Sequence, residues 1–219
     1  TYGDWSSDVC SSDLALTATE RDAMRAGLPE AMEHAKFALE LLKKYQDAHR
    51  EETETFAAFD SNYMGLVQPD GALEHYHGKL RFTDLNGNTI EDQLDPANYL
   101  DVIGESTEPW SYLKFPFIKE QGYPEGMYRV GPLARLNIAD KISTPQAQQA
   151  FNDWRAGKNC IRTSSFHYHW ARLIEIIYAL ERIEQLRDLL AAADRALPSE
   201  LLTRLNDLSH EFRMGDAAR

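Results

Sequence analysis

Two pairs of histidines are the residues of this chain that first suggest metal chemistry. His75 and His77 lie two apart on a predicted hairpin, so both side chains should face the same side of a sheet. His167 and His169 begin a predicted helix, where a separation of two residues places them about 200° apart around the axis. A zinc site needs three or four ligands, and neither pair has a third at a suitable spacing. We therefore interpret both pairs as structural or solvent-facing histidines.

Carboxylates and cysteines offer no clearer constellation. Glu105, Glu108 and Glu125 lie in a segment rich in aromatic residues, where burial would raise the pKa of a carboxyl group, but a solvated surface is the simpler interpretation. Cys10 and Cys160 form neither a disulfide framework nor a C-x-x-C metal pair. The chain also lacks a Walker phosphate loop and a G-x-S-x-G motif. The sequence therefore predicts no catalytic, cofactor-binding or metal-ligating residue.

Length and composition are those of a globular protein. The 219 residues suit one large domain or two small ones, and 43% of them are hydrophobic. The formal net charge of -12 argues against non-specific binding to nucleic acid, which needs basic patches. No apolar run reaches the roughly 18 residues of a transmembrane helix, and no signal peptide is visible. With so few cysteines, a reducing cytoplasm is the expected compartment.

The first fourteen residues have the texture of a sequence artefact. The tripeptide Ser-Ser-Asp occurs twice within residues 1–14, which have neither a helical nor a strand period. The stretch resembles translated sequencing adapter, and the alternative is a native disordered tail. We therefore assign residues 15–219 to the folded domain and expect Trp5 and Leu14 to be unpacked.

The elements that would position the remaining residues begin with a long helix. Helical spacing starts near residue 17 or 19 and runs to about residue 56, and the apolar stripe consists of Met32, Ala35, Leu39, Leu42 and Tyr45. Pro29 is a candidate for the first turn of this helix. Further helices are predicted over 165–193, over 146–156 and after Pro198. The two long helices should pack against each other or share one core.

Between these helices the hydrophobic period changes from 3.6 to 2 residues. Turn signals separate short segments of strand-like alternation, at residues 73–76, 79–84 and 89–90. A small antiparallel sheet is therefore predicted within residues 63–92, and Asp95 and Pro96 should then cap a short helix that ends near Gly104. The predicted fold class is α+β: mainly helical, with long packed helices and a small inserted antiparallel sheet.

Residues 105–137 are rich in aromatic residues, proline and glycine, so little regular structure is expected there. Their apolar area still demands burial, because one fully buried large side chain contributes roughly 1.5–3 kcal/mol. We therefore expect segment 109–137 to be packed, Arg135 to have carboxylate or carbonyl partners, and these side chains to be sheltered: Trp110, Phe115, Phe117, Tyr128 and Leu133.

This same segment carries a family resemblance. Residues 110–116 and 122–137 resemble the middle motif of [NiFe] hydrogenase large subunits, and the Val-Gly-Pro-Leu-Ala-Arg core at 130–135 is shared widely across those subunits. Residues 62–67 and 165–175 are similar to the soluble, bidirectional, NAD-linked branch. The chain therefore resembles the central part of a nickel-dependent hydrogenase large subunit, an internal fragment of an oxidoreductase acting on hydrogen.

The resemblance implies a cofactor and partners for the parent protein. In that family two C-x-x-C pairs near the chain ends hold a nickel–iron centre, and soft thiolates suit both metals. Neither pair is present here, so the resemblance implies that the NiFe ligands are absent from this chain and that the chain alone is inactive. The implied partners are a NAD(P)-reducing diaphorase module and an Fe–S small subunit, with H2 as substrate. Arg135 matches the family motif in a structural role.

Two other functions remain open from the sequence. The first is a non-catalytic, hydrogenase-like scaffold subunit that mediates subunit contacts in a redox complex. The second is an unrelated helical binding module in which the motif is a coincidence. The neighbouring DNA distinguishes the fragment from the scaffold, because C-x-x-C codons on both sides of this reading frame would favour the fragment.

Overall fold

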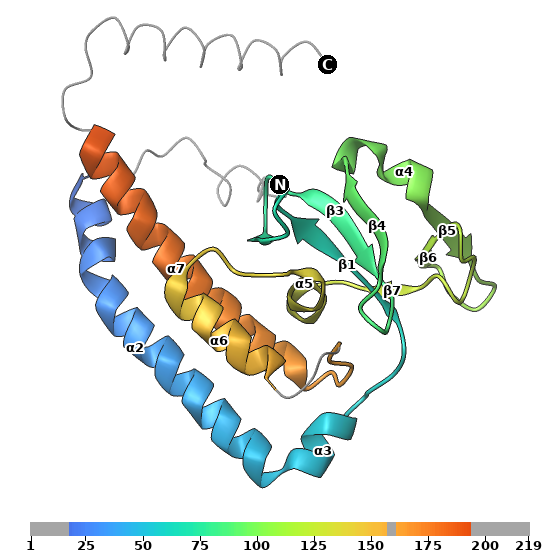
Figure 1. Cartoon of the computed structure of the whole chain (residues 1–219), viewed down its shortest axis with the longest axis horizontal. Helices are drawn as coiled ribbons and strands as arrows, with labels where there is room; N and C mark the ends of the chain where they lie inside the picture. Colours follow the sequence, from blue (N-terminus) through green and yellow to red (C-terminus); the bar gives the residue numbers. More distant parts are fainter. Residues whose placement is uncertain (1–17, 157–160, 194–219) are drawn as a thin grey trace, which may run out of the picture. The chain divides into compact units, whose positions relative to one another are not determined.

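A computed structural model of the chain describes residues 18–156 and 161–193 and has an α+β fold, which confirms the predicted class (Figure 1). The helices are α2 (Ala18–Ala48), α3 (Arg50–Thr55), η1 (Pro96–Asn98, a 3-10 helix), α4 (Tyr99–Val102), α5 (Pro132–Ile138), α6 (Pro145–Arg155) and α7 (His167–Ala193). The strands are β1 (Asn62–Val67), β2 (Leu73–Glu74), β3 (Lys79–Thr83), β4 (Thr89–Leu94), β5 (Ile103–Thr107), β6 (Lys114–Ile118) and β7 (Tyr128–Arg129). The chain divides into two compact units, Thr1–Glu181 and Arg182–Arg219.

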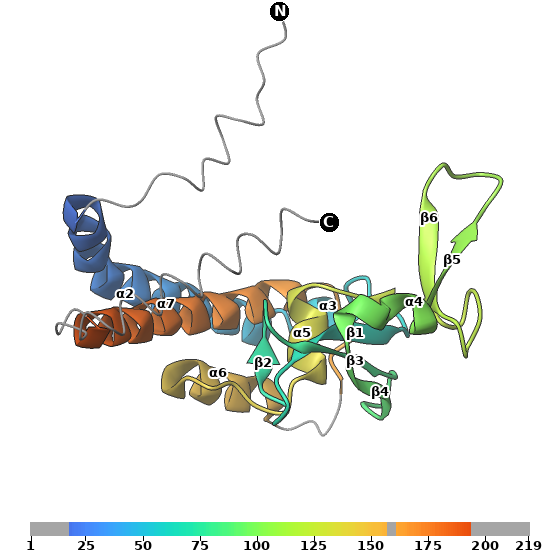
Figure 2. The ribbon, with the colours of Figure 1, turned by 90° about the horizontal axis from the view of Figure 1, so that it is seen from above.

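Helix α2 starts at Ala18, as the spacing predicts, but it contains Pro29 in its interior. The prediction that Pro29 marks the first helical turn is therefore wrong. Good helix formers before the proline, such as Met24 and Arg25, extend the helix in the N-terminal direction. Proline removes one backbone hydrogen bond and favours a bend, and Figure 2 shows the first turns of α2 turned away from the rest of the helix.

Strand β1 is the centre of the five-stranded sheet, whose order is β2-β1-β3-β4 with β7 added to β1. The pairings of β1 with β2 and β3, and of β3 with β4, are antiparallel and confirm the predicted small sheet. The sheet exceeds the predicted range 63–92, because β7 lies parallel to β1 with Asn62 opposite Tyr128. The Asn62 side-chain amide donates to Gln121 Oε1 at 2.6 Å and to the Glu125 carbonyl at 3.2 Å, and so holds the returning chain beside β1.

Residues 105–137 contain more regular structure than the sequence predicts. Strands β5 and β6 form a separate antiparallel hairpin, with Ile103 opposite Ile118 and Thr107 opposite Lys114. Figure 2 shows this hairpin standing away from the larger sheet. Pro116 lies inside β6, and a proline argues against a central strand; it is tolerated here because both strands of a two-stranded sheet are edge strands.

The packing prediction for segment 109–137 is only partly right. Leu133 is completely buried, and Phe115, Phe117 and Tyr128 are half-buried. Trp110, however, is 73% exposed, so the prediction that this side chain is sheltered is wrong. The hairpin carries it beyond the reach of the core.

The main core joins the helices to the inner face of the sheet. It includes Ala35 and Leu39 of α2, Ile174 and Ile177 of α7, and Leu136 of α5. Helix α2 and the part of α7 up to Glu181 contribute side chains to this one core, which confirms the prediction that the two long helices pack against each other or share one core. A second, smaller cluster of Leu80, Phe82 and Ile118 lies between the sheet and the base of the β5–β6 hairpin.

The predicted starts of the three later helices that the structure describes are confirmed. Asp95 Oδ1 accepts a hydrogen bond from the Ala97 backbone N–H at 3.0 Å and caps η1. Helix α6 begins at Pro145 and α7 at His167. Predictions for residues 1–14, for Cys160 and for a helix after Pro198 lie outside the described residues. Among the helices that the structure describes, none is long and apolar enough to cross a membrane.

Candidate functional site

Arg135 is held by a bidentate contact with Glu175. Arg135 lies on α5, where its Nε donates to Glu175 Oε1 at 2.6 Å and its Nη2 donates to Oε2 at 2.8 Å. Glu175 projects from α7, and its side chain is 11% exposed. The prediction that Arg135 has carboxylate or carbonyl partners is therefore confirmed, and the partner is the carboxylate of Glu175. The pair ties the Val-Gly-Pro-Leu-Ala-Arg segment to α7.

A histidine completes this cluster. His75 Nε2 lies 3.3 Å from Glu175 Oε1, and the His75 ring stacks on Tyr178 with 5.6 Å between the ring centroids. Burial alone would raise the pKa of Glu175, but hydrogen bonds from Arg135 and then from His75 outweigh it and hold the pKa below its ordinary value. A carboxylate kept ionised by a guanidinium at both oxygens is poorly suited to accept protons, so the cluster is suited to fastening α5, α7 and the β2–β3 connection together.

The two histidine pairs occupy other positions than expected. His75 and His77 lie in the connection after β2, not in a strand, because β2 ends at Glu74; the prediction that they share one sheet face is wrong. His77 packs edge-on against the ring of Tyr76. His167 is buried and His169 is exposed, as expected from their separation around the axis of α7. Within residues 18–156 and 161–193, no group of three or more His, Cys, Asp or Glu side chains is placed to hold a metal ion.

The three glutamates singled out from the sequence have separate surroundings. Glu105 pairs with Lys114 across the β5–β6 hairpin at 2.7 Å. Glu108 accepts a hydrogen bond from Ser106 Oγ at 3.1 Å at the end of the same hairpin. Glu125 is exposed near β7, where its backbone carbonyl holds Asn62. The geometry therefore gives these side chains local structural contacts.

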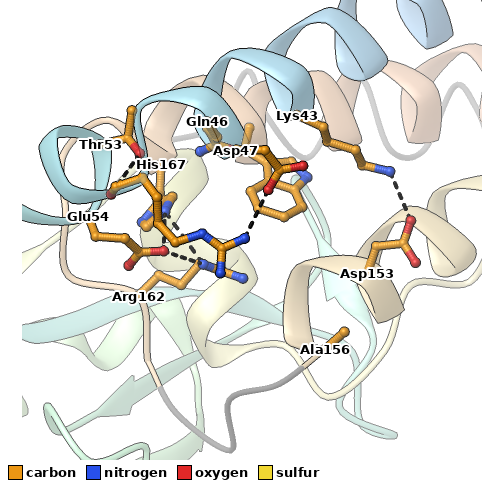
Figure 3. A pocket seen from close by; sticks show the side chains of 11 residues that line it. Lys43, Gln46, Asp47, Thr53, Glu54, Asp153, Ala156, Arg162 and His167 are labelled. Atoms are coloured by element: carbon orange, nitrogen blue, oxygen red, sulfur yellow. Dashed lines mark hydrogen bonds and ion pairs between the residues drawn. The ribbon is translucent and has the colours of Figure 1, made fainter.

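A cavity of about 370 Å³, lined mostly by polar and charged residues, lies among the helices (Figure 3). It is lined by side chains from the C-terminal end of α2, from α3, from the end of α6 and from the start of α7. Sequence reasoning did not point to it, because no motif marks its walls. One signal was available: Gln46 follows Leu39 by seven residues and therefore lies on the apolar face of α2.

The charges around the cavity are neutralised in pairs. Lys43 Nζ donates to Asp153 Oδ2 at 2.9 Å, as Figure 3 shows, and the guanidinium of Arg50 lies 3.0 Å from Asp47. Burial lowers the pKa of Lys43, but hydrogen bonds with Asp153 and Glu40 outweigh it, and the pKa rises above its ordinary value. An even balance of charge gives the cavity no preference for anions or cations.

The floor of the cavity is built around Arg162. Its guanidinium donates to the Trp154 carbonyl and lies 4.8–4.9 Å from the ring centroids of Trp154 and Trp170. Within the described part of the chain, the Gln46 side-chain amide and Trp170 Nε1 have no hydrogen-bond partner. A buried polar group without a partner costs on the order of 1–3 kcal/mol. The cavity can therefore accept a polar group, whether a water molecule or a polar side chain.

Comparisons with known proteins give the chain its context. No family model matches it. It is 38% identical over 167 residues to the A subunit of the vhu F420-non-reducing hydrogenase of Methanocaldococcus jannaschii, covering 76% of this chain and 40% of that protein. It is 35% identical over 178 residues to the beta subunit of the NAD-reducing hydrogenase HoxS of Cupriavidus necator, covering 78% and 36%. A third relative, at 36% identity over 136 residues, is the iron-sulfur A subunit of the F420-non-reducing hydrogenase of Archaeoglobus profundus.

The fold comparison agrees with these sequence matches. A crystal structure of an NAD+-reducing [NiFe]-hydrogenase in the H2-reduced state superimposes with a TM-score of 0.73 at 35% identity. The match covers 78% of this chain and 38% of the other. The chain thus spans about two fifths, or less, of the length of the proteins that it matches.

The names of these relatives correct the assignment that the motif suggested. They designate the A or the beta subunit of a hydrogenase, in one case with the word iron-sulfur, and none of the three specifies a large subunit. The assignment to a catalytic large subunit is therefore corrected to similarity with hydrogenase subunits of these A and beta designations. The nickel–iron centre that was assigned to the parent protein rested on the large-subunit resemblance alone, and it is withdrawn with it.

Proposed function

We propose that this chain is part of a subunit of a hydrogenase complex, an oxidoreductase that acts on H2. The observation that carries the proposal is the 35–38% identity to hydrogenase subunits over about three quarters of the chain. The fold similarity to a hydrogenase, with a TM-score of 0.73, supports it independently of any single motif. The whole complex supplies the redox chemistry, and this chain contributes a folded part of one subunit together with contacts to other subunits.

The geometry indicates what the described residues contribute. The Arg135–Glu175 pair and the Asn62 amide fasten two returning segments onto helix α7 and strand β1. Both contacts bring together parts of the chain that are far apart in sequence, and they fix the base from which the β5–β6 hairpin projects. A rigid base of this kind suits a subunit that must keep the neighbouring subunits at fixed positions for electron transfer.

For the electron acceptor we propose NAD+. The HoxS relative is named as NAD-reducing, and the solved structure is named as NAD+-reducing. The archaeal relatives are named as F420-non-reducing and match at a similar identity, up to 38%. An acceptor other than NAD+ is therefore the second candidate, and a cytoplasmic location stays a prediction.

Reconstitution tests the proposal. The chain would be co-produced with the hydrogenase subunits encoded beside it in its own genome, and the purified assembly assayed for H2-dependent reduction of a viologen dye and of NAD+. We expect co-purification in fixed stoichiometry and dye reduction by the assembly. We expect no turnover by the chain alone, since it spans only 36–40% of the length of the hydrogenase subunits that it matches. Failure of the chain to join any hydrogenase subunit would contradict the proposal, and dye reduction without NAD+ reduction would contradict only the acceptor.

A further inference from the structure

The tip of the β5–β6 hairpin exposes large apolar side chains without a covering element. Trp110 is 73% exposed, Tyr112 96% and Leu113 55%, and all three lie in the connection between the two strands. Scattered exposed apolar residues are normal, but a contiguous group marks an interaction surface. Tryptophan and tyrosine are also among the residues that most often dominate binding energy at protein interfaces.

The tip is continuous with a row of aromatic rings that leads back toward the body of the protein. The ring of Trp110 contacts Phe115 at 5.2 Å between centroids, and Tyr123 lies 6.1 Å from both Phe115 and Phe117. Phe115 and Phe117 alternate along β6 and therefore share one face of the hairpin. The residue that follows Phe117 in β6 is Ile118, which is buried in the smaller core.

Hydrogen bonds give the tip a defined shape. The Ser111 backbone N–H donates to the Glu108 carbonyl at 3.1 Å, and the Leu113 N–H donates to Ser111 Oγ at 3.1 Å. The Lys114–Glu105 pair links the strands below the turn. An apolar surface that is ordered before binding loses little conformational entropy when a partner covers it.

Charge restricts the kind of partner. Residues 99–126, which contain the hairpin and its flanks, include five carboxylates and two lysines. Such a surface repels the anionic headgroups of a membrane and is complementary to basic side chains. The fitting partner therefore offers an apolar pocket bordered by lysine or arginine.

We propose that Trp110, Tyr112 and Leu113 dock into an apolar pocket with a basic rim on another subunit of the hydrogenase complex. The inference rests on the proposed function and adds to it the part of the chain that makes the contact. Trp110 and Tyr112 are the anchors, because they combine the largest apolar area at the tip with a hydrogen-bonding N–H or O–H group. The acidic side chains around them provide orientation and a faster encounter.

The test compares two sets of exposed aromatic residues. The full chain with Trp110→Ala and Tyr112→Ala would be measured against the neighbouring hydrogenase subunits by biolayer interferometry, beside the unaltered chain. The matched control is Tyr76→Ala, an aromatic residue that is 82% exposed in the β2–β3 connection. We expect the double substitution to weaken binding at least roughly 30-fold, as for loss of interface anchors, and the control to change it less than about twofold.

Two further measurements keep the result interpretable. Circular dichroism should show unchanged folding of the double variant, because the replaced side chains are exposed. Subtracting the fluorescence of Trp110→Phe from that of the unaltered chain gives the emission of Trp110. This emission should shift to shorter wavelength when the partner is added, because the indole leaves water. Equal affinity of the double variant and the unaltered chain would overturn the docking proposal alone. No binding by the unaltered chain would overturn this inference and the proposed function together.

The same variants test whether the tip binds something other than a hydrogenase subunit. If the double substitution instead abolishes self-association, the tip binds a second copy and the proposal is overturned. If it abolishes binding to vesicles of phosphatidylcholine and phosphatidylglycerol, the tip binds lipid and the proposal is likewise overturned. Loss of binding confined to the hydrogenase subunits is the supporting result.

Discussion

Arg135 shows how a single side chain can hold a motif in place. Its guanidinium engages both oxygens of Glu175, so Arg135→Ala leaves a largely buried carboxylate without its cation. We expect this substitution to lower the free energy of unfolding by on the order of 2–3 kcal/mol, measured by urea denaturation. The matched control is Arg50→Ala, which removes an exposed pair with Asp47 and should cost less than about 0.5 kcal/mol. Equal effects of the two would contradict a stabilising role of the bidentate contact.

Glu175 also predicts how stability depends on pH. Its pKa is lower in the folded protein than the ordinary value of 4.5, so the folded state binds a proton less readily than the unfolded state. The resulting stability is fully present above the unfolded pKa and is lost as the pH falls through the folded pKa. The difference in unfolding free energy between the unaltered chain and Glu175→Gln should therefore narrow between about pH 6 and pH 3. A difference that stays constant in urea titrations over this range would show that Glu175 is not the responsible group.

At the residue scale, the sequence predicted that a side chain requires a partner but did not predict which residue that partner is. An unpaired buried guanidinium is costly, and the prediction that Arg135 has carboxylate or carbonyl partners followed from that cost alone. The identity of the partner did not follow, since Glu175 lies forty residues away and only the packing of α5 against α7 brings it near. His75 was assigned to a strand because alternating apolar and polar residues continue past the end of β2. The pattern therefore does not show that the strand ends at Glu74.

Strand β1 and helix α5 approach each other closely at Gly65. A Cβ atom at this position would lie 2.8 Å from Ile138 Cδ1 and 3.1 Å from Arg135 Cγ. We expect Gly65→Ala to lower the unfolding free energy by about 1–3 kcal/mol through overpacking. Gly27→Ala is the control, because that position on α2 has nothing within 4 Å, and the change should stabilise the helix by up to about 1 kcal/mol. If thermal unfolding showed a change in stability of the same sign for both variants, the close approach of β1 and α5 at Gly65 would be contradicted.

At the element scale, hydrophobic periodicity predicted the helices correctly. The β5–β6 hairpin was missed, because its proline and glycine residues argue against strands. The starts of α2, η1 and α6 followed from helical spacing and from proline at the first turn. The same proline rule failed for Pro29, where the helix continues through the residue. Pro116 and Gly104 likewise disfavoured strands, yet β5 and β6 pair only with each other and tolerate both residues.

Within the first compact unit, helix α2 exposes a row of large apolar side chains. Phe37, Leu41 and Tyr45 follow one another at four-residue spacing and are 69%, 57% and 44% exposed. We expect the isolated chain to associate as its concentration rises, because this stripe is then covered by other copies. Replacing Phe37 and Leu41 by Lys should favour the monomer in sedimentation velocity experiments. The control is Met24→Lys on the same helix, and a chain that stays monomeric at high concentration would contradict the prediction.

Because β7 returns to lie parallel to β1, residues 68–127 form a loop that backbone pairing closes at both ends. The entropy lost on closing a flexible loop grows only with the logarithm of its length, so doubling the loop costs about 0.6 kcal/mol more. The turn of the β5–β6 hairpin lies inside this loop. Insertions there leave the register of the five-stranded sheet unchanged, whereas one inserted residue in β1 would reverse the facing of every side chain beyond it. Evolution can therefore vary the length of the chain at the hairpin while β1 keeps its length.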